Sequence, residues 1–368
     1  MNRKKAKLIL VALVTSLSIL SGCSKESSKK SLEVTKWDNV YEGKNIHFYY
    51  EDFTNSQIEE LNRLYQLNGT IGSQGDELER AIQITKWIHT KMQYSQGSVS
   101  TKEDVIEILK EKETSPKASD REFSIVFNQV CTALGIYARR GEFRVKNAEI
   151  AKGRDYYKVN EIWSDKYNKW IMVDPSEGVY ITKENIPLSA MEVIESKLEN
   201  IEVKGIENSK DYISKLRNFI YSYTINIDNK IYGSKKSNSY ITYLPNGELP
   251  ELKFKQGYAP PSIYVYNSSL FTISPKVNYV DDNSDTVPTM IIMKKVVDEN
   301  KNDNKTFVVG VFKNSVMVDT YYLKINDQEW EKVAKYKEIT LNKGSNTISL
   351  SLDGNEVIRE IVIDKKIE

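Results

Sequence analysis

The sequence has little cysteine, little histidine and no excess of charge of either sign. Two cysteines in 368 residues exclude a scaffold held together by disulfides and a cysteine-rich zinc site. Two histidines, His47 and His89, leave little material for imidazole chemistry, and we expect no metal and no cofactor. Lysine and arginine number 52 against 51 aspartate and glutamate residues, which argues against a nucleic-acid-binding protein.

Long hydrophobic runs are scarce, and the most prominent one lies at the N-terminus. The 13 residues from Leu8 to Leu20 follow a positively charged segment and are too short to span a membrane, as is typical of a signal peptide. The next residues, Leu20-Ser21-Gly22-Cys23, resemble the bacterial lipobox, which implies cleavage before Cys23 and lipid attachment to its thiol. An ordinary secretory signal peptide with a chance cysteine is the alternative.

This reading predicts where the protein resides. Residues 1–22 would be the signal peptide, and residues 23–32 would be the lipidated Cys23 and a polar, flexible tether. Two acyl chains on one cysteine anchor a protein firmly. We therefore expect a protein that is bound to the membrane through Cys23, on the extracytoplasmic face of a bacterial cell.

The next part of the chain mixes strand and helix patterns. Residues 32–53 are strand-like, and hydrophobic residues then recur at three- and four-residue steps in 55–67, 77–94 and 119–135, which predicts helices. Thr101 to Asp104 is typical of a helix N-terminus. Alternating strands are expected at 156–164 and 169–174, and a helical linker at 196–218.

The C-terminal part has a different composition. Beyond about residue 218, alternating hydrophobic runs are separated by turn signals such as Asn246-Gly247 and Asp353-Gly354. Several short strands at this spacing predict a β-rich region with an Ig-like sandwich, of one or two modules, over residues 219–368.

Three motifs resemble the transglutaminase-like superfamily. The stretch from Phe123 to Arg139 ends in Gly-Ile-Tyr-Ala-Arg, Asn160-Glu161-Ile162 follows, and Trp170 to Pro175 reads Trp-Ile-Met-Val-Asp-Pro. The resemblance covers roughly residues 75–185. It implies an α+β, papain-like fold, which we assign to residues 33–195.

The same resemblance locates a catalytic triad. In the family a cysteine at a helix N-terminus is activated by a histidine, which an aspartate orients. The motif spacing puts the family cysteine at Asp120, the histidine at Tyr157 and the aspartate at Asp174, and a one-residue shift would put Tyr156 in place of Tyr157. Only the aspartate is retained, which implies a protein without the family's catalytic activity.

Ser119 is the alternative nucleophile, because a slip of one residue would bring it to the cysteine position. However, Ser119 and Glu122 have the spacing of a capping box, and no histidine follows His89 that could act as its base. The buried face of the same predicted helix includes Cys131, which we interpret as a core residue. We also interpret both histidines as structural.

The cleft of such a fold would lie beside these positions. We expect Ser119, Glu161, Trp163 and Trp170 to line it, and the carboxylates and phenol could converge into an acid–base pair or a site for a hard cation. The structural alternatives are that Asp174 caps a turn and that Glu161 pairs with Arg139 or with Arg140.

The sequence therefore leaves several functions open. The leading hypothesis is a catalytically inactive binding or scaffolding module for a peptide, peptidoglycan or an envelope protein. One alternative is an active amidase, peptidase or cross-linking enzyme with a non-standard triad. Another is a purely structural lipoprotein of a developmental envelope.

Overall fold

The computed structural model describes residues 29–72, 74–97, 100–295 and 306–366. The expected signal peptide and Cys23 lie outside these ranges. The chain divides into two units, Met1–Lys30 and Ser31–Glu368, and every helix and strand described belongs to the second. Within the described ranges, none of the helices has the length and apolar character needed to cross a membrane.

Helices form where the hydrophobic spacing predicts them. Asp76 and Asp104 cap α3 and α4 by accepting hydrogen bonds from the backbone N–H groups of Glu79 and Glu107. The helix α5 is almost entirely buried, because it packs against α1, α3 and α4 as well as against the strands β4 and β5. The bounds of these helices are α1 (Ser56–Tyr65), α2 (Leu67–Thr70), α3 (Glu77–Lys91), α4 (Val105–Thr114) and α5 (Asp120–Ala133).

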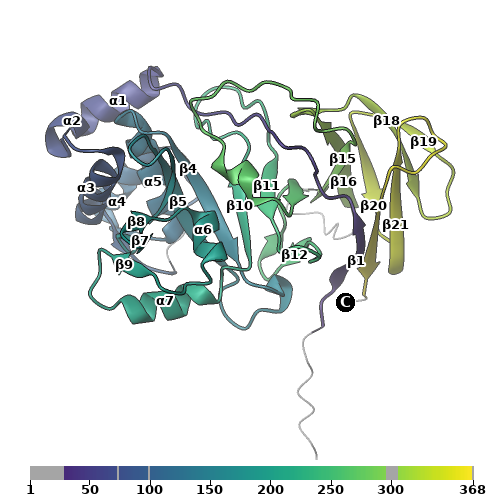
Figure 1. Ribbon diagram of the computed structural model, residues 1–368, viewed down its shortest axis with the longest axis horizontal. Helices are drawn as coiled ribbons and strands as arrows, with labels where there is room; N and C mark the ends of the chain where they lie inside the picture. Colours follow the sequence, from purple (N-terminus) through teal and green to yellow (C-terminus); the bar gives the residue numbers. More distant parts are fainter. Residues whose placement is uncertain (1–28, 73, 98–99, 296–305, 367–368) are drawn as a thin grey trace, which may run out of the picture. The chain divides into compact units, whose positions relative to one another are not determined.

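A nine-stranded sheet adjoins these helices (Figure 1). Its strands follow the order β14-β11-β10-β4-β5-β6-β7-β8, with β9 paired to β7. All of its pairs are antiparallel except β11 with β14. The bounds are β4 (Ala138–Arg144), β5 (Tyr156–Ser164), β6 (Lys169–Asp174), β7 (Val179–Lys183), β8 (Ile186–Pro187), β9 (Glu202–Lys204), β10 (Ser222–Asn226), β11 (Tyr240–Tyr243) and β14 (Ser262–Val265).

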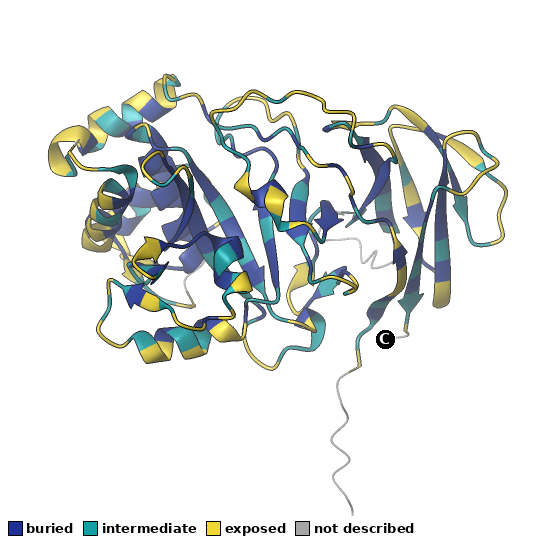
Figure 2. Cartoon of the chain, in the orientation of Figure 1, coloured by how far each residue is buried: buried dark blue, intermediate teal, exposed yellow. Residues whose placement is uncertain are grey.

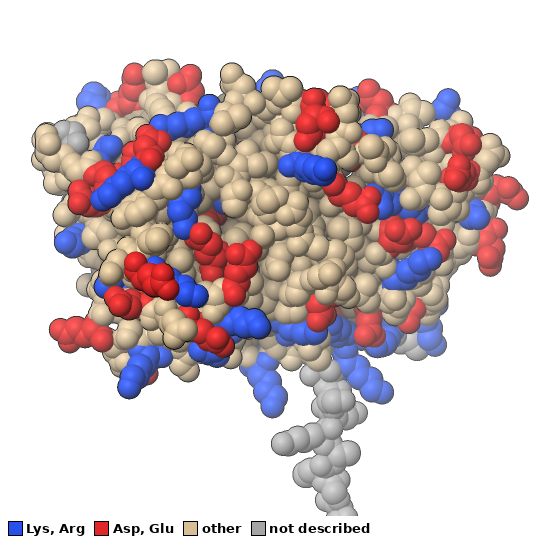
Figure 3. Space-filling view, in the orientation of Figure 1, with Lys and Arg blue, Asp and Glu red and all other residues tan. Residues whose placement is uncertain are grey.

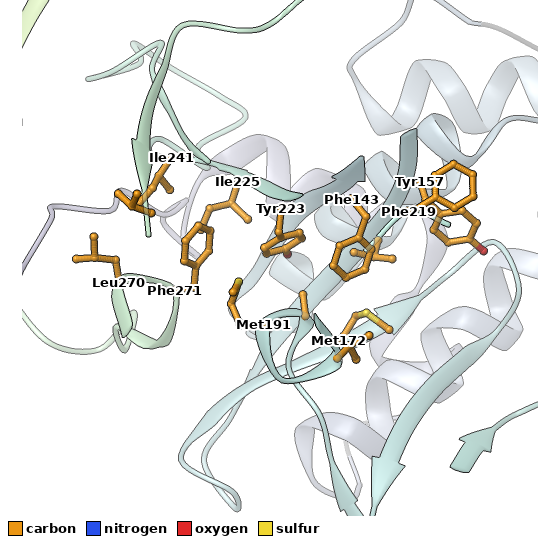
Figure 4. Packing of buried hydrophobic residues seen from close by; sticks show 14 of the residues in the cluster. Phe143, Tyr157, Met172, Met191, Phe219, Tyr223, Ile225, Ile241, Leu270 and Phe271 are labelled. Carbon is orange, nitrogen blue, oxygen red and sulfur yellow. The ribbon is translucent and has the colours of Figure 1, made fainter. Parts of the chain in front are cut away.

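The two faces of this sheet contribute to separate hydrophobic clusters. Along β6, Ile171 and Val173 pack into the cluster of the helices α1 to α5, whereas Met172 packs on the other face. That other face is covered by α6 (Ala190–Glu195), α7 (Ser209–Arg217) and the short helix η2 (Ser268–Thr272). Figure 4 shows part of its cluster, which extends from Ile241 and Leu270 to Tyr157 and Phe219.

Two further antiparallel sheets share a third hydrophobic cluster. Buried residues alternate with more exposed ones along β22, as expected for a strand with one face in a core, whereas β15 and β16 each contain a run of four buried residues (Figure 2). One sheet has the order β1-β22-β21-β18-β19, and in the other β16 pairs with β15, β17 and β20. The bounds are β1 (Leu32–Asp38), β15 (Thr289–Lys294), β16 (Thr306–Lys313), β17 (Val316–Met317), β18 (Thr320–Ile325), β19 (Glu331–Ala334), β20 (Tyr336–Thr340), β21 (Gly344–Ser351) and β22 (Arg359–Lys365).

The sheets do not follow the ranges 33–195 and 219–368. The N-terminal β1 pairs with the C-terminal β22, and β10, β11 and β14 extend the nine-stranded sheet. The range 196–218, predicted as a helical linker, contains the helix α7 and also the strand β9, which joins the sheet, and Tyr212 and Leu216 of α7 are buried in its cluster. Residues 46–50 form no strand, and Tyr49 makes one isolated bridge to Asp228. Local hydrophobic patterns identify strands but not their partners.

Candidate functional site

The N-terminus of α5 is held by a network of polar side chains. The Glu122 carboxylate accepts hydrogen bonds from the backbone N–H of Ser119 at 2.8 Å and from its hydroxyl at 3.0 Å. The buried Lys112 ammonium lies 2.5 Å from the other Glu122 oxygen. Ser119 thus has the capping role that its spacing to Glu122 indicates, and its hydroxyl donates to a carboxylate that Lys112 already neutralises.

Asp120, the first residue of α5, is 6% exposed and forms an ion pair with Arg154. The Arg154 guanidinium also lies 4.5 Å from the ring centre of Tyr156 and 5.6 Å from that of Tyr157, and it donates a hydrogen bond to the Tyr94 hydroxyl at 3.2 Å. A carboxylate in this position is stabilised by the helix dipole as well as by the guanidinium. Arg154 was not expected from the sequence, because it precedes β5 in an irregular segment without a recognisable motif.

The Asp174 carboxylate, at the end of β6, is completely buried and accepts several hydrogen bonds. One oxygen accepts from the Tyr157 hydroxyl at 2.5 Å and from the Tyr212 hydroxyl at 3.2 Å. The other accepts from the backbone N–H and the hydroxyl of Ser176, at 3.0 and 2.7 Å, and from the N–H of Glu177 at 3.2 Å. Asp174 therefore caps the turn after β6 and also receives two phenols, of which Tyr212 was not anticipated.

The titration of this cluster is governed by burial. Burial raises the pKa of the Asp174 carboxyl above its ordinary value. Burial, together with the charge of Asp174, raises the pKa of Tyr157 far beyond that of a free phenol, and the same holds for Tyr212. The two phenols consequently keep their protons and act as hydrogen-bond donors.

The structure thus brings the three expected triad positions together through one additional residue. Arg154 pairs with Asp120 and lies over the ring of Tyr157, whose hydroxyl contacts Asp174. The tyrosine–aspartate hydrogen bond occupies the place that the resemblance gives to the histidine–aspartate pair. It is Tyr157, and not its neighbour Tyr156, that contacts Asp174.

The thiol and the imidazoles do not supply an alternative. Cys131 is fully buried in the helical cluster, and burial raises the pKa of its thiol well above the usual range. The His89 ring nitrogen Nε2 lies 2.9 Å from the backbone carbonyl of Pro175, to which it donates. His47 is stacked between Tyr49 and Tyr279, at 4.0 and 5.0 Å between ring centres.

Three residues expected in the cleft lie in the interior instead. Glu161, Trp163 and Trp170 are 0%, 4% and 1% exposed. Glu161 shares the face of β5 with Tyr157 but lies four residues further along, about 13 Å away at the rise of a strand. The structure places these side chains in the interior and not along a cleft: Glu161 of β5 meets the N-terminus of α6, and Trp170 of β6 packs against Trp163 and donates to the Ile273 carbonyl.

Glu161 has a structural role. It accepts hydrogen bonds from the Arg139 guanidinium at 2.8 Å, the Tyr223 hydroxyl at 2.9 Å and the Ala190 N–H at 2.9 Å. Arg139 lies 4.1 Å from the ring centre of Trp170, so the cation is enclosed by an aromatic ring and a carboxylate. Of the two arginines considered from the sequence, Arg139 is the partner.

No metal site emerges from these carboxylates. Asp120, Glu161 and Asp174 are each held by separate partners, Arg154, Arg139 and Tyr157. Among residues 29–72, 74–97, 100–295 and 306–366, no three histidine, cysteine, aspartate or glutamate side chains are grouped in a way that could hold a metal ion.

Comparison with known proteins gives the family of part of the chain. Residues 65–175 match the model of the transglutaminase-like superfamily. No curated protein matches the chain. Among solved structures, a protein from Cytophaga hutchinsonii provisionally assigned as a cysteine protease is 17% identical, with a TM-score of 0.27 over 40% of this chain and 47% of that chain.

A second solved structure is the transglutaminase of red sea bream, which is 10% identical, with a TM-score of 0.31 over 94% of this chain and 63% of that chain. The chain thus spans about half of the first of these proteins and under two thirds of the second. The motifs around Asp120, Tyr157 and Asp174 lie within the matched range or at its end. This chain therefore contains a transglutaminase-like domain.

Proposed function

We propose that the protein is a lipid-anchored module of the bacterial cell envelope whose transglutaminase-like domain has lost catalysis and serves in binding or scaffolding. One observation carries the proposal. The position that the resemblance gives to the nucleophilic cysteine holds Asp120, and this carboxylate is engaged in a nearly buried ion pair with Arg154.

Acyl transfer through this site would lack both of its reactive groups. A thiol or hydroxyl nucleophile must lose its proton to a nearby base, whereas a carboxylate is already ionised and reacts less readily when a cation neutralises it. Asp120 is stabilised by a guanidinium and a helix N-terminus, which lowers its nucleophilicity. Tyr157 retains its proton and donates a hydrogen bond to Asp174, so it cannot accept a proton from a thiol or hydroxyl.

The anchor is proposed from the N-terminal sequence. The charged segment, the 13-residue hydrophobic run and Cys23 agree with a lipoprotein signal, and they support membrane attachment on the extracytoplasmic face. Metabolic labelling of the cells with a palmitate analogue tests this, with Cys23→Ser as the variant. We expect label in the wild type only, and label retained by Cys23→Ser would contradict lipidation at Cys23.

A turnover assay tests the loss of catalysis. Protein beginning at Ser24 is offered a glutamine-donor protein with a labelled amine, peptidoglycan fragments and a peptide pool. We expect no turnover by protein that circular dichroism shows to be folded. The alternative enzyme predicts turnover that Asp174→Asn abolishes, whereas Asp165→Asn, a change of an exposed carboxylate in the same domain, leaves it intact. That result would overturn the proposal.

A further inference from the structure

A groove lies on the face of the nine-stranded sheet that also packs α5. It consists of two hollows with volumes of about 430 and 300 Å³, which share Glu103, Arg140, Asn226 and Tyr240 and so adjoin. Tyr156 and Lys158 of β5 line the larger hollow, while Tyr157 between them points to the opposite face. The groove is therefore distinct from the Tyr157–Asp174 cluster, although Tyr156 touches Arg154.

Cations outnumber carboxylates in this groove. Its carboxylates are Glu103 and Glu142, and each is shared between two cations: Glu103 by Arg121 and Arg140, Glu142 by Arg144 and Lys158. Lys230 and Lys235 add to the positive charge of the smaller hollow, where Lys230 lies 3.8 Å from Asp228, and Arg144 also pairs with Asp155 at 2.9 Å. The surplus is local, because over the face seen in Figure 3, Lys and Arg lie among Asp and Glu, and the whole chain has a formal net charge of only +1.

The positive groups of the groove are held in place by aromatic rings. The Arg144 guanidinium lies 3.6 Å from the ring centre of Phe254, and the Lys158 ammonium lies 5.2 Å from that of Tyr156. Although burial opposes the charge of Glu142, Lys158 and Arg144 hold its pKa below the usual range. These two rings are covered by cations, so this part of the groove offers fixed positive charges, which favours an anionic ligand.

The floor of the groove contains polar groups without partners. Ser124 and Asn128 of α5 are 2% and 4% exposed, and within the described part of the chain neither Ser124 Oγ nor Asn128 Oδ1 has a hydrogen-bond partner. They are four residues apart on one side of the helix and line the larger and the smaller hollow. A buried acceptor without a donor is unfavourable, so a ligand that supplies a donor would gain a hydrogen bond there.

We propose that this groove binds an acidic peptide in extended form. Side-chain carboxylates would contact Arg140, Arg144 and Lys158, and backbone N–H groups would donate to Asn128 and Ser124. A peptide carries both kinds of group at a regular spacing, whereas a phosphate polymer carries acceptors without N–H donors. The inference rests on the proposed binding role but not on the loss of catalysis.

Fluorescence anisotropy with a labelled hexaglutamate peptide tests the proposal on protein beginning at Ser24. The variant Arg140→Gln/Lys158→Gln changes two groove cations that are 33% and 27% exposed. The matched control Lys36→Gln/Lys337→Gln removes the same charge from paired lysines on β1 and β20. We expect saturable binding that the groove variant weakens about tenfold and the control by less than about twofold.

Other probes give outcomes that would overturn the proposal. Hexaglutamine should not bind, and poly(glycerol phosphate) should bind more weakly than hexaglutamate at equal charge. Tighter binding of the phosphate polymer, equal losses in the groove and control variants, or no binding of hexaglutamate would each refute an acidic-peptide site. Turnover in the assay described above would refute the loss of catalysis and leave this inference standing.

The variant Asn128→Leu tests the floor of the groove. It removes an acceptor that has no partner among the described residues, so we expect an unchanged or higher urea midpoint together with binding of hexaglutamate that is several-fold weaker. A purely structural role predicts the reverse, a lower midpoint with unchanged binding, and that result would contradict the proposed contact.

Discussion

The replacement Arg154→Met tests whether the Asp120–Arg154 ion pair is a stable part of the folded protein. The side chains of Arg154 and Asp120 are 13% and 8% exposed, so removal of the guanidinium leaves the Asp120 carboxylate nearly buried and without its counter-ion. Breaking a buried pair costs about 3–5 kcal/mol. The N-terminus of α5 still stabilises the carboxylate by about 0.5–1 kcal/mol. We expect a loss of about 3 kcal/mol in the free energy of unfolding, which is measured by urea denaturation.

The reverse change, Asp120→Asn, should cost less, about 2 kcal/mol, because the guanidinium keeps the Tyr94 hydroxyl at 3.2 Å and the Tyr156 ring. The double variant should lose about 3.5 kcal/mol, which leaves a coupling of about 1.5 kcal/mol. The exposed pair Arg63 and Glu60 serves as a control, since a double-mutant cycle of Arg63→Met and Glu60→Gln should give less than about 0.5 kcal/mol.

The coupling energy between Arg154 and Asp120 shows whether the two side chains interact in the folded protein in solution. Coincident transitions by circular dichroism and tryptophan fluorescence are needed for these free energies to be meaningful. If the costs of Arg154→Met and Asp120→Asn add to within about 0.5 kcal/mol, Arg154 does not hold Asp120 in solution. The carboxylate would then be available for chemistry, and the main argument against catalysis would fail.

Three further predictions concern the interior of the domain. Tyr157→Phe should lower the free energy of unfolding by about 1.5–3 kcal/mol, because Asp174 loses a short hydrogen bond and keeps only the one from Tyr212 among its two phenols. Binding of hexaglutamate should not change. An unaltered urea midpoint would contradict this prediction. Gly141→Ala should destabilise the protein by about 1–3 kcal/mol, because an added Cβ would collide with the Tyr223 hydroxyl, and Tyr223→Phe should relieve part of that cost. The third prediction concerns pH. Burial raises the pKa of Asp174 in the folded state above its value in the unfolded state. The contribution of Asp174 to stability is therefore fully present below about pH 4 and is lost as pH rises through the folded-state pKa. Relative to Asp174→Asn, the wild type should therefore lose stability from about pH 4 upward, and a difference in urea midpoint that is constant with pH, or grows in favour of the wild type, would contradict the prediction.

Local chemistry determined much of the fold in advance. The helices α1, α3 and α5 lie within a few residues of the ranges expected from hydrophobic spacing, because a helix that buries one face needs that spacing whatever it packs against. The N-terminus of α4 directly after Thr101 to Asp104 and the capping box of Ser119 and Glu122 could be predicted because helix caps depend on residues close in sequence. The transglutaminase-like domain was recognisable from three ordered motifs, and its model matches residues 65–175.

The partners of strands and buried charges could not be read in the same way. Nothing in the alternation of residues 32–38 says that β1 pairs with β22 at the far end of the chain, or that β10 and β11 extend the sheet of the transglutaminase-like domain. Such pairings depend on which edges meet after collapse, which is a property of the whole chain. For the same reason the sequence predicted that either Arg139 or Arg140 pairs with Glu161, and only the structure shows that the partner is Arg139.

The candidate site can be divided in the same way. The sequence by itself determined that Asp120 and Tyr157 stand at the positions that the resemblance gives to a cysteine and a histidine, and residue identity limits which proton transfers a side chain can perform. Only the tertiary structure decided that Arg154 neutralises Asp120 and that Tyr157 and Tyr212 converge on Asp174. The same folding placed cations from β4, β5 and α5 around one groove. These contacts join residues of separate elements, and ion pairs and hydrogen bonds act only over the few ångströms that folding brings about.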